Sequence, residues 1–309
     1  MSQIPAEPPQ DTSMPDEISM RDAKPDNAFR VIGKSSYLWF EPRSPVLVVS
    51  FDNLATLDDP YPRMPWIARQ VADLGFSILG VQSRRKDWFR GTDADHLIQT
   101  LSDQGFFQTF ETVVFIGASM GAFAALNYAP LVSGARVLAL SPQSTMNKRI
   151  APFETRFPWA VKNSDWTEPA FIDAADAIPD IPSVTIVFDP FDATDKQHAM
   201  RMRGPHVQLA PVPNSTHEAV RTVMKAGAFD AMLLEFIEKG KLGSDFWNAM
   251  RQRKTVRKWA RAFVSNLSQS HHPTMALRVY DHLIERDRYH FAMQARRELL
   301  EAHPELRNL

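Results

Sequence analysis

Residues 112–130 read TVVFIGASMGAFAALNYAP, in which an apolar run, a short glycine-containing stretch and a helix-like run follow one another. Gly117 and Gly121 each stand two positions from Ser119, in a chain that has only 12 glycines among its 309 residues. A very sharp turn needs glycine wherever a larger side chain would collide with the neighbouring backbone. The stretch therefore predicts a tight strand-to-helix turn with Ser119 at its tip.

The runs around this turn predict the fold. Unbroken apolar runs at 45–50, 76–81 and 112–117 alternate with amphipathic helical stretches at 66–75 and 94–105. Strands without polar alternation are buried on both faces, and strands separated by helices form parallel crossover units. The same reasoning predicts an antiparallel hairpin and three later strands, at 29–33 with 36–42, and at 135–142, 184–190 and 206–212. We predict an α/β protein with a mostly parallel, doubly wound sheet flanked by helices.

The remaining segments predict the domain organisation. Residues 1–27 are rich in proline and acidic residues and poor in large apolar side chains, which predicts a flexible N-terminal tail. The α/β domain is expected over 28–240. The strand–helix alternation breaks at about 142–182, and an insertion of that length predicts a lid. Residues 244–309 are predicted to form a C-terminal helical segment.

Composition and charge exclude several classes of function. Lys and Arg total 35 and Asp and Glu total 36, so the formal charge is -1 and no nucleic-acid binding is expected. The absence of cysteine excludes disulfides, thiolate metal sites and a cysteine nucleophile. No basic start followed by an apolar stretch opens the chain, and no window approaches the roughly 20 apolar residues of a membrane-spanning helix. We therefore expect a cytoplasmic protein without a transmembrane segment.

The strand, GASMG and helix resemble the nucleophile elbow of the α/β-hydrolase superfamily, and the resemblance covers about residues 28–239. It implies that Ser119 is a nucleophile and that the Met120 amide, at the positive end of a helix, forms part of an oxyanion hole. The second donor is expected after the strand at 45–50. The family often has His-Gly there, whereas this chain reads SFDN, and alignment by the strand end selects the Asp52 amide.

The resemblance also implies an acid and then a histidine, in that order along the chain. The run SVTIVFDPFDATD offers aspartates at 189, 192 and 195. The family's strand-G-x-x-D pattern selects Asp192, while Asp189 stays open as an alternative. His217 occupies a polar loop between the last strand and a helix, where the family has its histidine. The alternatives are His198 and His206.

Two basic stretches suggest where other molecules bind. The loop SRRKDWFRG follows the strand at 76–81 and is expected at the carboxyl edge of the sheet, near the nucleophile. Arg84, Arg85 and Trp88 are therefore predicted to bind an anionic substrate, and a merely solvated basic loop is the alternative. The segment RQRKTVRKWARAF carries six cations and is expected to be solvated, with docking on an acidic partner or a membrane surface as the alternative.

These features predict a serine hydrolase that cleaves an ester, or a thioester or amide, through an acyl-enzyme. An acyltransferase would use the same residues. A third hypothesis is a hydrolase-like scaffold that binds a partner through its C-terminal helices. We expect a small or acylated substrate and no cofactor. No metal site is expected, because Arg221 replaces the second histidine that a zinc protease would need four residues after His217.

Overall fold

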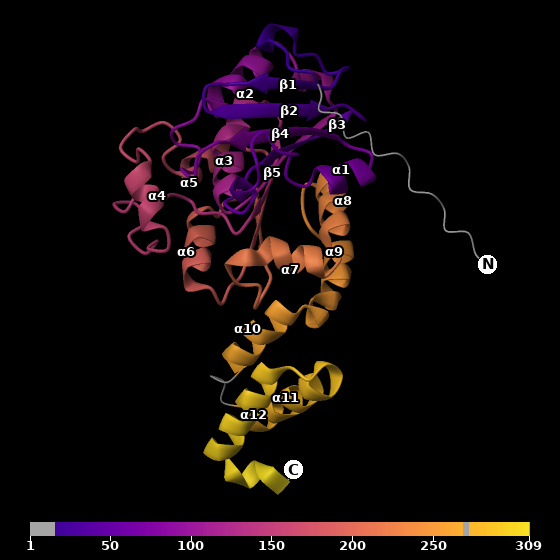
Figure 1. Ribbon diagram of the computed structural model, residues 1–309, viewed down its shortest axis with the longest axis vertical. Coiled ribbons are helices and arrows are strands. Elements are labelled where there is room, and N and C mark those ends of the chain that lie inside the picture. Colours follow the sequence, from indigo (N-terminus) through magenta and orange to yellow (C-terminus); the bar gives the residue numbers. More distant parts are fainter. Residues whose placement is uncertain (1–15, 268–271, 309) are drawn as a thin grey trace, which may run out of the picture.

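The computed structural model describes residues 16–267 and 272–308. Its centre is an eight-stranded sheet with the strand order β1-β2-β4-β3-β5-β6-β7-β8 (Figure 1). β2 pairs antiparallel with β1 and β4, and all other neighbours are parallel. The strands are β1 (Phe29–Ile32), β2 (Ser36–Glu41), β3 (Val46–Phe51), β4 (Ser77–Ser83), β5 (Thr112–Ala118), β6 (Arg136–Leu140), β7 (Val184–Phe188) and β8 (Val207–Pro211). The predicted mostly parallel α/β sheet is confirmed.

Helices cover both faces of the sheet. One face packs against α1 (Ala68–Asp73), α7 (Ala219–Lys225) and α8 (Phe229–Lys239). The other packs against α2 (Ala94–Asp103), α3 (Met120–Tyr128), α5 (Ala174–Ala177) and α6 (Ala193–Arg201). Successive residues of a strand point to opposite faces, so Val48 belongs to one apolar cluster and Val49 to the other. Burial on both sides explains why these strands show no polar alternation.

The register of the central strands brings three chain turns to one edge. Ser50 pairs with Ile116, and Ala118 pairs with Leu140. The carboxyl ends of β3, β5 and β6 therefore lie side by side. The residues that follow these ends are where an open α/β sheet forms its binding crevice.

Part of the predicted N-terminal tail lies outside the described residues, which begin at 16. Within the described part, the amide of Arg30 donates to the Asp16 carbonyl, and the amide of Ile18 donates to the Arg30 carbonyl. A short 3₁₀ helix follows at Met20–Asp22. Residues 16–18 therefore lie against the edge strand β1.

The connection between β6 and β7 contains the predicted lid. It holds α4 (Pro158–Asn163), α5 and a 3₁₀ helix at Ile178–Asp180. Arg90 fastens this connection to the loop after β4, because its guanidinium donates to the carbonyls of Asp165 (2.9 Å), Glu168 (2.6 Å) and Ala170. That the segment opens and closes stays a prediction.

The C-terminal segment packs on the α/β domain. α8 ends at Gly240, whose φ of 68° suits glycine, and α9 (Ser244–Ala249), α10 (Arg257–Leu267), α11 (Pro273–Asp287) and α12 (His290–Ala302) follow. Figure 1 shows α10 beyond α7, with α11 and α12 farther from the sheet. Trp259 and Tyr280 belong to the same apolar cluster as α7 and α8. None of the helices in the described ranges combines the length and the apolar character needed to cross a membrane.

Candidate active site

Ser119 lies at the tip of a strained turn between β5 and α3. Its backbone has φ 51° and ψ -115°, a conformation that costs a non-glycine residue free energy and is concentrated at functional sites. A Cβ on Gly117 would stand 2.2 Å from the Gly121 carbonyl carbon, and one on Gly121 would stand 2.7 Å from the Asp52 carbonyl oxygen. Both glycines are therefore required by close backbone contacts, and the turn lifts the Ser119 side chain above the sheet edge.

His217 meets this serine from the loop after β8. Its Nε2 lies 2.9 Å from Ser119 Oγ, while its Nδ1 lies 2.8 Å and 3.0 Å from the two carboxylate oxygens of Asp195. A carboxylate only accepts hydrogen bonds, so Nδ1 carries the proton of the neutral imidazole. Nε2 is then the acceptor for the Ser119 hydroxyl. This is the tautomer that a general base requires.

The structure corrects the assignment of the acid, because Asp195 and not Asp192 contacts His217. Asp192 is the N-cap of α6, where its Oδ1 accepts from the amides of Thr194 (3.0 Å) and Asp195 (2.9 Å). An N-cap side chain turns back onto its own helix. Asp195 lies in the first turn, and its buried side chain reaches His217. The predicted pattern thus selected a carboxylate three residues too early.

Asp189, the alternative left open by the sequence, joins two loops at the site. Its Oδ1 accepts from the amides of Phe191 (2.9 Å) and Asn214 (3.1 Å), and its Oδ2 accepts from the Thr216 amide (2.7 Å). Burial raises the pKa of this carboxyl even though the three amides stabilise its ionised form. Asp189 therefore holds the loop that carries His217.

Arg156 fixes the charge of Asp195. Its Nη1 donates to Asp195 Oδ1 at 2.8 Å, and its Nε and Nη2 donate to Glu154. Burial alone would raise the pKa of Asp195, but the hydrogen bond from His217 together with the charge and hydrogen bond of Arg156 lower it below its ordinary value. Asp195 is consequently ionised at neutral pH and available to orient His217.

The two alternative histidines do not reach Ser119. His198 is fully buried, with Nδ1 accepting from the Ser144 amide (3.0 Å) and Nε2 facing Glu154 Oε2 (3.1 Å). Burial lowers the pKa of His198, so it is a neutral structural residue behind the site. His206 stands one residue before β8, at the far end of that strand from the His217 loop.

Sequence reasoning missed Gln143, whose side chain contacts both Ser119 and His217. Its Nε2 donates to Ser119 Oγ at 3.1 Å and lies 3.2 Å from His217 Nε2. Its Oε1 accepts from the indole N–H of Trp88 at 3.1 Å, and the side chain is fully buried. The signal for Gln143 was its place three residues after β6, at the carboxyl edge of the strand next to β5.

The structure also corrects the second oxyanion donor. The amide of Asp52 donates to the Val81 carbonyl (3.1 Å), and the next amide, of Asn53, donates to Thr56 Oγ1 (3.0 Å). The strand pairing of β3 with β4 thus extends one residue beyond the predicted end and uses the Asp52 N–H. Met120 is the first residue of α3, a position whose N–H has no acceptor within the helix.

The Asp52 carboxylate is turned into a buried ion pair. Its Oδ2 accepts from Arg63 Nη1 (2.6 Å) and from the Ser83 amide (3.2 Å), and both side chains of the ion pair are almost fully buried. Burial raises the pKa of Asp52 to about 6, against the opposing effects of Arg63 and Ser83. This ion pair explains how the structure tolerates a buried acid beside the Ser119 turn.

We expect Arg63→Gln to lower the free energy of unfolding by about 3 kcal/mol at pH 8, because it leaves the Asp52 carboxylate buried without its cation. The loss should shrink at pH 5, since a carboxyl whose pKa is raised in the folded state is protonated there and needs no cation. Urea unfolding at both pH values measures this. Lys86→Gln, which breaks the exposed pair with Asp58, is the control and should cost less than about 1 kcal/mol. Equal losses at the two pH values would contradict the account.

Of the three predicted substrate-binding residues, one is buried and two are exposed. Trp88 is fully buried, donates its indole N–H to Gln143 and packs against Phe157 and Trp159 at ring distances of 5.1 Å and 6.0 Å. Phe157 and Trp159 belong to the predicted lid, so a contact between Trp88 and a substrate stays a prediction. Arg84 and Arg85 are exposed, with the Arg84 guanidinium 4.6 Å from the Tyr61 ring centre. Their role in substrate binding stays a prediction.

Among known proteins, only solved structures match this chain, and the three that follow do so at low sequence identity. No model of a protein family matches the chain, and no curated protein matches it in sequence. Among solved structures, the acetyl xylan esterase from Paenibacillus sp. R4 has a TM-score of 0.47 at 15% identity, covering 66% of this chain and 79% of that one. Est1E from Butyrivibrio proteoclasticus has a TM-score of 0.45 at 13% identity, covering 69% and 99%. The capsule O-acetyltransferase of Neisseria meningitidis serogroup A has 0.44 at 11% identity, covering 68% and 94%.

The sheet order, the antiparallel second strand and the serine turn between β5 and α3 define an α/β-hydrolase fold. The predicted fold class is thereby confirmed, and it is the fold that the resemblance implied. Over residues 16–267 and 272–308, no group of three or more His, Asp or Glu side chains is arranged to hold a metal ion.

Proposed function

We propose that this protein is a serine hydrolase of the esterase type that works through an acyl-enzyme. The observation that carries the proposal is the continuous hydrogen-bonded chain from Ser119 Oγ through His217 to Asp195. A serine hydroxyl is a poor nucleophile until a base takes its proton, and an imidazole in this tautomer is such a base.

The reaction starts with attack of Ser119 Oγ on the substrate carbonyl carbon, while His217 Nε2 takes the hydroxyl proton. Collapse of the tetrahedral intermediate breaks the bond to the leaving group, which receives that proton from His217. Water then attacks the acyl carbon and gives a proton to His217. Collapse of the second tetrahedral intermediate breaks the bond to Ser119 Oγ, which takes that proton back from His217, and the carboxylic acid leaves. Asp195, held by Arg156, keeps His217 oriented and stabilises the imidazolium that forms twice in the cycle.

The negative oxygen of each intermediate needs hydrogen-bond donors that are in place before reaction. The Met120 amide at the N-terminus of α3 supplies one of them, next to the positive end of the helix. Gln143 has a positioning role, because its amide group holds the Ser119 side chain from the β6 side. It is itself held by Trp88, so its orientation is fixed before substrate binds.

Acyl transfer to an alcohol is the second function that the same residues support. It differs from hydrolysis only in the acceptor that attacks the acyl-enzyme, and analysis of products with and without added alcohols separates the two. The scaffold hypothesis predicts instead that the Ser119 hydroxyl is no more reactive as a nucleophile than that of a surface serine.

A fluorophosphonate probe tests the proposal, because it forms a covalent bond with an activated serine and mimics the tetrahedral intermediate. We expect stoichiometric labelling of the wild-type protein, detected by intact mass, and none of Ser119→Ala. Ser102→Ala, a change on the surface helix α2, is the control and should label like the wild type. Equal labelling of Ser119→Ala and the wild type would refute the proposal, and unlabelled wild-type protein would favour the scaffold hypothesis.

A further inference from the structure

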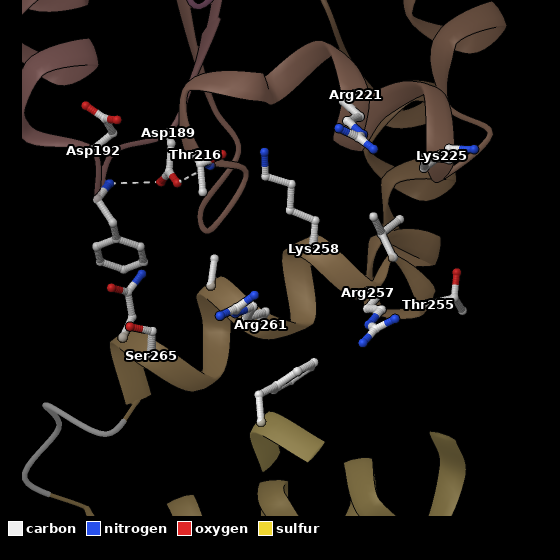
Figure 2. A pocket seen from close by; sticks show the side chains of 15 residues that line it. Asp189, Asp192, Thr216, Arg221, Lys225, Thr255, Arg257, Lys258, Arg261 and Ser265 are labelled. Atoms are coloured by element: carbon white, nitrogen blue, oxygen red, sulfur yellow. Dashed lines mark hydrogen bonds between the residues drawn. The ribbon is translucent and has the colours of Figure 1, made fainter. Parts of the chain in front are cut away.

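A cleft of about 940 Å³ separates α7 and the His217 loop from the C-terminal helix α10 (Figure 2). Thr216, the residue before His217, lies in its wall, as do Asp189 and Asp192. Ser119 and His217 are not among its lining residues. The cleft is therefore a neighbour of the proposed catalytic site and is distinct from the place of the reacting hydroxyl.

Helix α10 forms the second wall of the cleft and is fastened to the same loop. The indole N–H of Trp259 donates to the Pro213 carbonyl (2.8 Å), and Asn266 Nδ2 donates to Asn214 Oδ1 (2.7 Å). These bonds tie α10 to the loop that precedes His217. The cleft is therefore bounded by two parts of the chain that contact each other directly.

Positive side chains line the cleft on both walls: Arg221 and Lys225 belong to α7, and Arg257, Lys258 and Arg261 belong to α10 (Figure 2). Glu218 pairs with Lys258 (2.5 Å) and with Arg221 (3.3 Å). Within residues 16–267 and 272–308, Lys225, Arg257 and Arg261 make no ion pair. Three cations that line the cleft thus have no carboxylate of the described residues within ion-pair distance.

The two acids of the cleft do not offset these cations. Asp189 accepts three backbone hydrogen bonds, and Asp192 caps α6. Figure 2 places both at the end of the cleft opposite Lys225 and Arg257. Since the whole chain has a formal charge of -1, this concentration of positive charge is a local feature and does not reflect a generally basic protein.

The size and lining of the cleft narrow the class of ligand. Its volume lies in the range that small-molecule sites occupy, and a concave space between two helices does not fit a flat membrane surface. A guanidinium group can donate two parallel hydrogen bonds to two oxygens of one phosphate or carboxylate group. Phe191, 62% exposed, and Phe291 add apolar lining beside the charges.

We propose that this cleft binds a small, multiply charged anion of the di- or triphosphate type, with Lys225, Arg257 and Arg261 as its charged contacts and an apolar part of the ligand against the phenylalanines. The site lies outside the Ser119–His217–Asp195 constellation, and its ligand binds whether or not Ser119 reacts. Because Thr216 lines the cleft, the ligand lies directly behind the loop of the proposed general base.

Isothermal titration calorimetry tests the proposal on the full chain and on Ser119→Ala, so that binding is separated from catalysis. The probes are pyrophosphate and ADP, with inorganic phosphate and citrate as arms that distinguish a polyphosphate from a single phosphate or a tricarboxylate. We expect saturable binding of pyrophosphate and ADP with one site per chain. The double variant Arg257→Gln, Arg261→Gln should weaken it at least tenfold.

The matched control is Arg251→Gln, Arg278→Gln, which removes the same charge from exposed positions of the C-terminal segment outside the cleft. It should change affinity less than twofold, and both variants should retain the wild-type melting temperature. Equal weakening by the two double variants would overturn the proposal, since it would reveal attraction to net charge alone. Absence of saturable pyrophosphate and ADP binding would overturn it too, as would binding only to vesicles of an anionic phospholipid. Tighter binding of citrate than of pyrophosphate would refute the phosphate assignment.

Discussion

Replacing Asp195 by Asn should lower kcat/KM for a simple ester such as p-nitrophenyl acetate by about 1,000- to 10,000-fold. The asparagine amide presents an N–H or a carbonyl to His217 Nδ1 where the native residue presents two acceptors. The imidazole then loses its preference for the tautomer with an open Nε2, and the imidazolium formed during reaction loses its counter-charge. The rate of fluorophosphonate labelling of Ser119 should fall in parallel and gives a second measurement on the same variant.

Asp192→Asn is the matched control for this prediction. It removes the same charge three residues away, and asparagine is as good an N-cap as aspartate, so α6 should keep its start. We expect kcat/KM within about threefold of wild type. Circular dichroism of both variants checks that α6 and the sheet are intact. A large loss in Asp192→Asn together with a small one in Asp195→Asn would restore the assignment that the sequence pattern suggested.

The difference between Asp192 and Asp195 illustrates what sequence can and cannot locate. Ser119 is identifiable because its signal is local: two glycines, a strand before and a helix after fix the turn within five residues. The acid depends on where α6 begins. A shift of the helix start by one turn exchanges the residue that caps the helix with the one that faces His217, and the pattern DPFDATD fits either start.

Other features were unpredictable because they depend on contacts between distant segments. The amide of Asp52 is unavailable to an oxyanion hole, because it donates its hydrogen bond to the Val81 carbonyl of β4. Trp88 belongs to a loop of charged residues, yet the β6–β7 connection covers it and Gln143 binds its indole. The cleft between α7 and α10 likewise depends on the packing of two helices that are distant in sequence, which the sequence pattern does not predict.

Gly117→Ala should destabilise the protein by more than about 4 kcal/mol, or prevent folding altogether. The new methyl group would lie 2.2 Å from both the carbonyl carbon and the carbonyl oxygen of Gly121, and 2.5 Å from the Ala122 amide nitrogen. These are backbone atoms of the first turn of α3, so they cannot move aside as a flexible side chain would. Relief requires α3 to shift away from β5, which would also displace Ser119 from His217. Urea unfolding, or the yield of folded protein when no transition is measurable, reports the effect.

Gly134→Ala separates this steric cost from the general cost of replacing a glycine. Gly134 has a φ of 79° but no atom within 4 Å of an added Cβ, so alanine there pays only for its backbone conformation, about 1 to 2 kcal/mol. Gly117 has the reverse properties, with no left-handed φ and severe overlap. If Gly117→Ala were as stable as Gly134→Ala, the close contact between β5 and the start of α3 would not exist, and the turn would have no physical need for its first glycine.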